Sequence, residues 1–122
     1  MITNLTTGKP IFQRLVLCDT FWKRGRGLMF RRPIDPDTAY LFVEPRESIA
    51  STTIHMLFVF FAIGVIWLDR HQRVVDLRHA RPFRPLVAPR APAQYFLECH
   101  PRALERVNIG DTLTWKDSRH TG

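Results

Sequence analysis

Apolar and polar residues alternate with a period of two along several short stretches of this chain. Because successive side chains of a strand point to opposite faces of a sheet, this period predicts β-strands that bury one face. The alternating stretches are residues 12–18, 39–43, 73–77, 93–99 and 112–115. Residue types common in turns, such as Pro, Gly, Asp and Ser, separate these stretches at 33–37, 44–48 and 108–111. The pattern therefore predicts many short strands joined by turns.

The stretch at residues 93–99 shows how the alternation would orient one strand. The side chains expected to face the core are those of Ala93, Tyr95, Leu97 and Cys99. Gln94 and Glu98 would face outward. Phe96 breaks the alternation, and we interpret it as covering a second apolar cluster.

The longest apolar run, residues 56–68, contains no polar side chain. A helix that crosses a membrane needs about 20 such residues, and charged residues follow the run at once, so we expect no transmembrane segment. The run is rich in Val, Ile, Phe and Trp and is broken at residues 62–64. It therefore favours two buried strands, at about 54–60 and 64–69, which would form the centre of the core.

Only two segments have the signals of helix ends. One is 20–26, with Asp19 or Thr20 as its cap, and the other is 101–107, with a proline in its first turn. Neither is long enough to build a core. Many short strands with one or two short helices predict an all-β fold, a compact β-sandwich or barrel.

Length and composition indicate a single folded domain. The 122 residues are 45% hydrophobic and 11% aromatic, enough for one core. We place this β domain at residues 10–116 and expect flexible ends at 1–9 and 117–122. The first residues show no basic segment followed by an apolar one, so we predict no signal peptide and a cytoplasmic location.

The cysteines and histidines do not predict a metal or cofactor site. Cys18 and Cys99 are too few for a disulfide scaffold and lack the C-x-x-C spacing of zinc sites. Each lies in an alternating apolar stretch, which favours a buried thiol. None of the five histidines has the short spacing to another that zinc ligands generally show.

The chain is strongly basic. Eighteen Lys and Arg residues face eleven Asp and Glu residues, for a formal net charge of +7, and arginine outnumbers lysine fifteen to three. Guanidinium groups suit paired contacts with phosphate or carboxylate, which points to an anionic partner. The other interpretation is that a genome rich in G and C encodes Arg in place of Lys, and that the charge serves solubility.

Two segments gather this positive charge. The first, residues 23–32, holds five basic residues around two glycines, so that several guanidinium groups could converge on one anion. The second, residues 70–90, holds eight Arg and His residues but a single acid, Asp76. Phe83 lies there between Arg81 and Arg84, where it could stack on a ligand or pack over a strand edge.

His55 stands at the start of the longest apolar run. A histidine there could act as a general base or as a hydrogen-bond donor to an anion, although a structural histidine is the more frequent case. The sequence assigns it no partner. A nucleophilic pair with Cys99 is disfavoured because the alternation places that thiol inward.

Four motifs, in their order and at their spacings, resemble one known family. They are Arg24-Gly25-Arg26-Gly27-Leu28-Met29, the segment from Ile54-His55-Met56 to Asp69, Arg81-Pro82-Phe83-Arg84, and Ile109-Gly110-Asp111. The corresponding family motifs are R-x-x-GLM, H/W-x-F-F/M followed by ID-x-x-F-x-D, PWR, and GD. Over residues 10–116 the chain resembles the domain of unknown function 192 family of bacteria and archaea.

The resemblance implies a fold more than a function. It implies a compact β-sandwich of the jelly-roll kind, and it carries over no activity because the family has no established biochemical activity. Many relatives carry an export signal. The resemblance also implies an aspartate where this chain has Gly64 and a proline where it has Ala62. If that aspartate pairs with the family arginine, Arg24 has to find another acid, water or a ligand.

We therefore expect a non-enzymatic binding domain with a shallow basic groove, for an anionic ligand or the acidic surface of a partner. The candidate ligand-binding residues are Arg24, Arg26, His55, Phe83 and Arg84. Nucleic acid is the weaker candidate ligand, because the sequence lacks the paired aromatic strands typical of RNA-binding domains. Two alternatives stay open: a small hydrolase or isomerase that uses His55 as its general base, and a structural accessory domain of a larger assembly.

Overall fold

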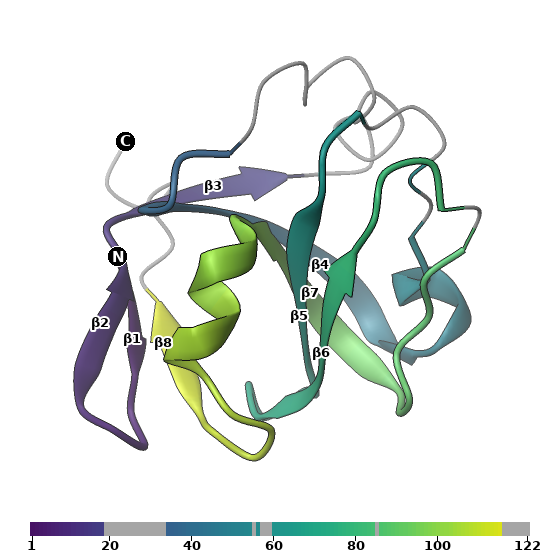
Figure 1. The fold of residues 1–122 in the computed structure, drawn as a ribbon. Coiled ribbons are helices and arrows are strands. Elements are labelled where there is room, and N and C mark those ends of the chain that lie inside the picture. The colour runs from purple at the N-terminus through teal and green to yellow at the C-terminus, as the bar shows by residue number, and fades with distance from the viewer. Residues whose placement is uncertain (19–33, 55, 57–59, 85, 116–122) are drawn as a thin grey trace.

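The computed structural model describes residues 1–18, 34–54, 56, 60–84 and 86–115 (Figure 1). The strands in these residues form two sheets, with orders β2-β1-β8 and β3-β4-β7-β5-β6. The elements are β1 (Ile2–Asn4), β2 (Lys9–Phe12), β3 (Arg14–Cys18), β4 (Thr38–Ser48), η1 (Ala50–Thr52), β5 (Ile63–Leu68), β6 (Val74–Ala80), β7 (Ala93–Cys99), η2 (Pro101–Arg106) and β8 (Leu113–Trp115). The prediction of an all-β fold with few short helices is confirmed.

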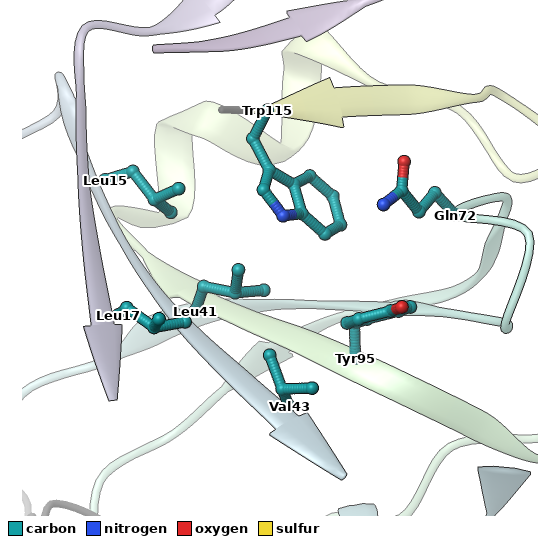
Figure 2. Close-up of a pocket in the computed structure, with 7 residues that line it drawn as sticks. All are labelled: Leu15, Leu17, Leu41, Val43, Gln72, Tyr95 and Trp115. Carbon is teal, nitrogen blue, oxygen red and sulfur yellow. The ribbon is translucent and has the colours of Figure 1, made fainter. Parts of the chain in front are cut away.

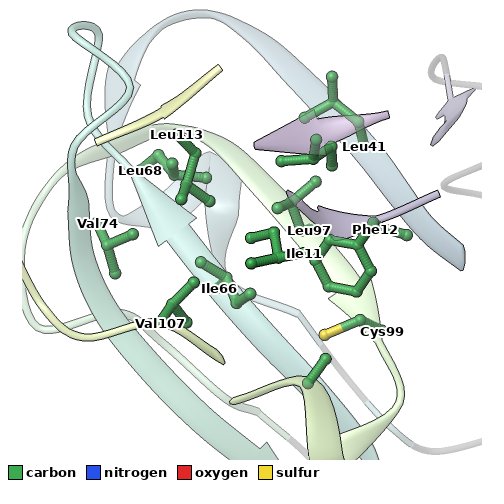
Figure 3. Packing of buried hydrophobic residues seen from close by; sticks show 13 residues of the cluster. Ile11, Phe12, Leu41, Ile66, Leu68, Val74, Leu97, Cys99, Val107 and Leu113 are labelled. Carbon is green, nitrogen blue, oxygen red and sulfur yellow. The ribbon is translucent and has the colours of Figure 1, made fainter. Parts of the chain in front are cut away.

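Both faces of the five-stranded sheet are buried. Strand β5 has no exposed position, because its side chains point alternately into two clusters. The small-sheet cluster, between the two sheets and η2, consists of Ile2, Ile11, Phe12, Ala39, Leu41, Ile66, Leu68, Val74, Leu97, Cys99, Ala103, Val107 and Leu113 (Figure 3). The loop cluster, on the opposite face, consists of Cys18, Ile34, Phe42, Ile54, Met56, Ile63, Val65, Trp67, Ala80, Val87, Ala93 and Phe96. A strand covered on both faces has a continuous apolar sequence, which explains the second part of the long apolar run, Ile63–Leu68.

The long apolar run forms one of the two strands predicted for it. The second prediction is confirmed as β5, at Ile63–Leu68. The first, at 54–60, is wrong for the described residues: Ile54 forms only an isolated bridge with Val87, and Phe60 is 70% exposed. Here the chain leaves the sheet and lies over it, so its apolar side chains cover the core rather than pair with a strand.

Two other boundaries differ from the prediction. The stretch 12–18 is divided between β2 and β3, which belong to different sheets, so the chain changes sheets at Gln13. The turn predicted at 44–48 is wrong, because β4 continues to Ser48. An irregularity in its pairing with β7 between Val43 and Ser48 accommodates Pro45, which cannot donate a ladder hydrogen bond.

The predicted orientation of the side chains of β7 is correct only in part. Phe96 does cover a second cluster, the loop cluster, while Leu97 and Cys99 lie in the small-sheet cluster. The outward assignment of Glu98 is wrong, because its side chain shares the covered face of Phe96 and is fully buried. Ala93 also belongs to the loop cluster rather than to the face of Leu97.

The chain ends and the two predicted helices have different outcomes. Within residues 1–9, Ile2–Asn4 form β1, which pairs with both β2 and β8. The flexibility expected for the chain ends stays a prediction. The helix predicted at 101–107 is present as the 3₁₀ helix η2, which His100 caps by accepting a hydrogen bond from the Arg102 N–H. Residues 20–26 and 117–122 lie outside the described residues, and no helix in the described ranges is long and apolar enough to span a membrane.

Gly64 allows η2 to approach β5 closely. A Cβ atom at this position would lie 3.0 Å from Cγ of Leu104 and 3.2 Å from Sγ of Cys99. In this chain the space beside position 64 is thus filled by Leu104. The aspartate that the family resemblance implies at this position would have to displace that side chain.

Restoring this aspartate tests the packing. We expect Gly64→Asp to lower the free energy of unfolding by about 3 kcal/mol, because it would bury a carboxyl group against apolar atoms. Gly64→Ala, which adds only the Cβ, should cost about 1 kcal/mol. Urea unfolding of both variants measures the effect. The same measurements with Leu104→Ala added show how much of the loss comes from the contact with Leu104. Full stability of Gly64→Asp would contradict this account.

Candidate functional site

The arginine-rich connection between β6 and β7 begins with a tight turn. Arg84 N–H donates to the Arg81 carbonyl at 3.4 Å, and Phe83 has a φ of 64°. A proline at the second position and a positive φ at the third are the features of a type II turn, where the third residue is usually Gly or Asn. An aromatic residue in this conformation is strained, and such strain is concentrated at functional sites.

The turn presents an aromatic side chain to solvent. The Phe83 side chain is 53% exposed and packs edge-to-face against Phe60, with ring centroids 5.2 Å apart. Leu86, further along the same connection, is 70% exposed. We call Phe60 and Phe83 the aromatic tip. An exposed aromatic pair next to arginines is a candidate contact surface.

The backbone of the turn is attached to the core. Phe83 N–H donates to the Met56 carbonyl, and Met56 N–H donates to the Arg84 carbonyl, both at 2.7 Å. Ile54 and Val87 exchange a second pair of hydrogen bonds, at 3.0 and 2.8 Å. Because Ile54, Met56 and Val87 are buried in the loop cluster, these bonds fix the turn relative to the large sheet.

Asp76 fixes the far end of the same connection. Its carboxylate is 1% exposed and accepts hydrogen bonds from the Leu77 N–H at 2.8 Å and the Arg90 N–H at 3.0 Å. The Nε atoms of Arg90 and Arg78 lie 3.3 and 4.0 Å from its oxygens. One buried acid thus draws two arginines together, while the side chains of Arg78 and Arg90 stay 46% and 67% exposed.

The two arginines of the turn, Arg81 and Arg84, have a different environment. Within the described part of the chain, neither Arg81 nor Arg84 forms an ion pair, and both are exposed. Among the described residues, no carboxylate competes with an external anion for these guanidinium groups. Phe83 lies between them in sequence, so this turn carries an exposed ring and two exposed arginines.

The structure places only some of the predicted site residues. Phe83 and Arg84 are neighbours in the turn, whereas Arg24, Arg26 and His55 lie outside the described residues. Their convergence with Arg84 stays a prediction. Sequence reasoning missed the contribution of Phe60 and the structural role of Asp76. The position of Asp76 as the single acid among eight basic residues was the signal for that role.

The two thiols are buried, as predicted. Burial raises the pKa of the Cys99 thiol, and the negative charge of Glu98 raises it further, against a smaller opposite effect of Arg106. Cys99 Sγ donates to the Gly64 carbonyl at 3.5 Å. A thiol held protonated in this way is a poor nucleophile, which argues against the pair with His55.

In the ranges that the structure describes, no three His, Cys, Asp or Glu side chains lie close enough together to hold a metal ion.

Tyr40, which faces Glu98 across β4 and β7, has a raised pKa, caused mainly by burial and secondarily by Cys18. Its hydroxyl is therefore protonated at neutral pH.

The role of Asp76 can be tested by truncation. We expect Asp76→Ala to lower the free energy of unfolding by about 2 to 3 kcal/mol, because it leaves two partly buried N–H groups and two arginines without their acceptor. Asp35→Ala is the matched control, since Asp35 is half-exposed and pairs with Arg14 at 4.0 Å. Urea unfolding should show a loss below about 1 kcal/mol for the control; equal losses would contradict the assignment.

The raised pKa of Cys99 predicts a pH dependence of stability. The thiol ionises more readily in the unfolded chain, so the free energy of unfolding should fall as the pH rises above about 8.5, the ordinary thiol value. Cys99→Ala should lose less stability than the parent between neutral and alkaline pH. Urea titrations across this range measure the difference, and identical slopes for both proteins would refute the prediction.

Comparisons with known proteins agree with the observed fold. A UPF0127 protein of Thermococcus kodakarensis is 43% identical over 118 residues, which cover 94% of this chain and 73% of that protein. A UPF0127 protein of Pyrococcus furiosus is 40% identical over 114 residues, covering 92% and 95%. A crystal structure of a protein of unknown function from Novosphingobium aromaticivorans matches with a TM-score of 0.74 at 22% identity, covering 93% of this chain and 81% of that one.

The match to a family model settles the classification. The model of an uncharacterized protein family, DUF192, matches residues 3–115, nearly the whole chain. This match extends from within β1 to the end of β8, the first and last strands of the described residues. The chain therefore belongs to the domain of unknown function 192 family, as its motifs predict.

Proposed function

We propose that this protein is a non-enzymatic binding module whose turn at residues 81–84 binds the acidic surface of a partner protein. The observation that carries the proposal is the turn itself. It holds an exposed aromatic ring in a strained conformation between Arg81 and Arg84, which have no ion-pair partner within the described ranges.

The chemistry of the turn suits a protein partner. Aromatic and arginine side chains are enriched in the energetically important centres of protein interfaces, and lysine is depleted there. Arginine binds carboxylates through paired hydrogen bonds, and Phe83 with Phe60 supplies apolar area beside them. This combination favours an acidic surface that also carries apolar side chains.

The rigidity of the turn supports the same proposal. Backbone hydrogen bonds from Met56 and the carboxylate of Asp76 hold the two ends of the connection on the core. A contact surface that is already ordered loses less conformational entropy when its partner binds. The strain at Phe83 is then offset by the surrounding bonds rather than by the partner.

Nucleic acid is the second candidate ligand, because guanidinium groups bind phosphate as well as carboxylate. One turn with a single aromatic pair offers few stacking positions for successive bases, which favours the protein partner. The structural accessory alternative relies on the same aromatic tip but predicts binding that depends little on salt. The hydrolase alternative rests on His55, which lies outside the described residues, and Cys99 lends it no nucleophile.

Fluorescence polarisation tests the proposal with three labelled probes: a peptide rich in Glu and Phe, single-stranded DNA and single-stranded RNA. We expect saturable binding of the peptide that weakens between about 50 and 200 mM salt. Arg81→Ala with Arg84→Ala should weaken it at least about tenfold, or about 1.4 kcal/mol. Arg102→Ala, an exposed arginine of η2, is the matched control and should stay within about twofold.

Each other outcome has a definite meaning. Tighter binding of DNA or RNA than of the peptide would replace the acidic protein with nucleic acid as the ligand class. Equal losses in the turn variant and in Arg102→Ala would show that only net charge matters and would overturn the proposal. Adding Arg24→Ala to the series tests the predicted convergence of the two basic segments.

A further inference from the structure

A separate hollow of about 200 Å³ lies between the two sheets, at the edge formed by β3 (Figure 2). Leu15 and Leu17 of β3 and Leu41 and Val43 of β4 line one side. Their shared face follows from the strand register, in which Leu17 lies beside Leu41. The side chain of Val43 is 45% exposed there. The hollow is the outer continuation of the small-sheet cluster, which is not completely closed here.

Two aromatic residues and an amide line the rest of the hollow. Tyr95 of β7 and Trp115 of β8 pack edge-to-face, with ring centroids 5.4 Å apart. Figure 2 shows the side chain of Gln72 beside these rings, with its amide directed toward them. The Gln72 amide and the Tyr95 hydroxyl lie on one side of the hollow, whereas the indole nitrogen of Trp115 lies on the side of Leu15 and Leu41 (Figure 2). The apolar hollow thus has hydrogen-bonding groups on two sides.

Gln72 occupies this position at a conformational cost. It has a φ of 65° in the tight turn between β5 and β6. Gln72 N–H donates to the Asp69 carbonyl at 2.9 Å, and the Asp69 carboxylate accepts from the Arg73 N–H at 3.0 Å. Glycine or asparagine is the usual residue at such a left-handed turn position. A glutamine at this position, with its amide in a hollow, points to a function for that amide.

The backbone of Gln72 also connects the turn to the opposite wall. Its carbonyl accepts a hydrogen bond from the Leu113 N–H at 3.0 Å, at the start of β8. Trp115 lies two residues further along this strand, whose register with β1 is regular. The backbone segments that carry the amide and the indole are therefore fixed relative to each other, which helps to order a binding site.

We propose that this hollow binds a small neutral amphipathic molecule, with one ring or branched aliphatic group and one hydroxyl or amide group. The volume suits a single ring, since an apolar cavity of about 150 Å³ in another protein binds benzene. None of the seven lining side chains is charged, so a charged ligand would lose hydration without gaining a partner. The Gln72 amide both donates and accepts, which matches a hydroxyl or amide.

The site is independent of the proposed acidic partner. Gln72 precedes β6 and Arg81 follows it, so the hollow and the arginine turn are associated with opposite ends of this strand. A negative result for one proposal therefore does not contradict the other. The ligand would cover apolar area that Leu15, Leu17, Val43 and Trp115 leave accessible.

Protein NMR tests the proposal with three probes of similar size: phenol, toluene and benzoate. We expect phenol to shift the Trp115 indole N–H and Gln72 side-chain signals saturably, toluene to bind several-fold more weakly, and benzoate weakest. Gln72→Gly removes the amide and suits the left-handed turn, so the variant should stay folded. It should bind phenol about fivefold more weakly and toluene unchanged.

Two further variants complete the test. Val43→Phe, which fills the hollow, should abolish saturable shifts by all probes. Gln94→Ala, which removes an amide from the residue next to Tyr95, is the matched control and should bind as the parent does. The proposal is overturned if no probe gives saturable shifts with a dissociation constant below about 10 mM. It is also overturned if Val43→Phe or Gln72→Gly leaves phenol binding unchanged.

Discussion

The requirement to cover both faces of the five-stranded sheet determines most of this structure. Strand β5 is apolar at every position, so each face of the sheet needs its own layer. The small sheet and η2 supply one layer, and Gly64 lets η2 approach closely. Loop segments supply the other, where Trp67 Nε1 also donates to the Thr52 carbonyl at 2.8 Å.

Both proposed sites follow from the way in which these layers are built. The arginine turn belongs to the loop layer: Ile54, Met56 and Val87 pack into the core, and their backbone bonds leave Phe83 exposed. The hollow lies where the small sheet does not reach the β3 edge, so that Leu15 and its neighbours stay accessible. The arginine turn depends on the rigidity of the loop layer, and the hollow depends on the incomplete closure of the layer formed by the small sheet.

Each site also contains a non-glycine residue with a positive φ, Phe83 in the turn and Gln72 in the hollow. In both places backbone hydrogen bonds maintain the conformation, with partners at Met56 and Asp69. Glycine at either position would relieve this backbone strain, and strain of this kind is concentrated at functional sites. Membership of the family agrees with the fold, whereas the two proposed binding sites are to be tested on this chain.

The sequence by itself determined the all-β class, the strand at Ala93–Cys99, the short helix after Pro101, the burial of both cysteines and the family. These follow from local alternation and from motif spacing. It could not determine that the segment containing Ile54 leaves the sheet, that β4 continues past Pro45, or that Glu98 is buried. It predicted Phe83 and Arg84 as site residues but not the contact with Phe60 or the hollow beside Trp115. Those features depend on which layer covers each face, and only contacts between residues distant in sequence decide that.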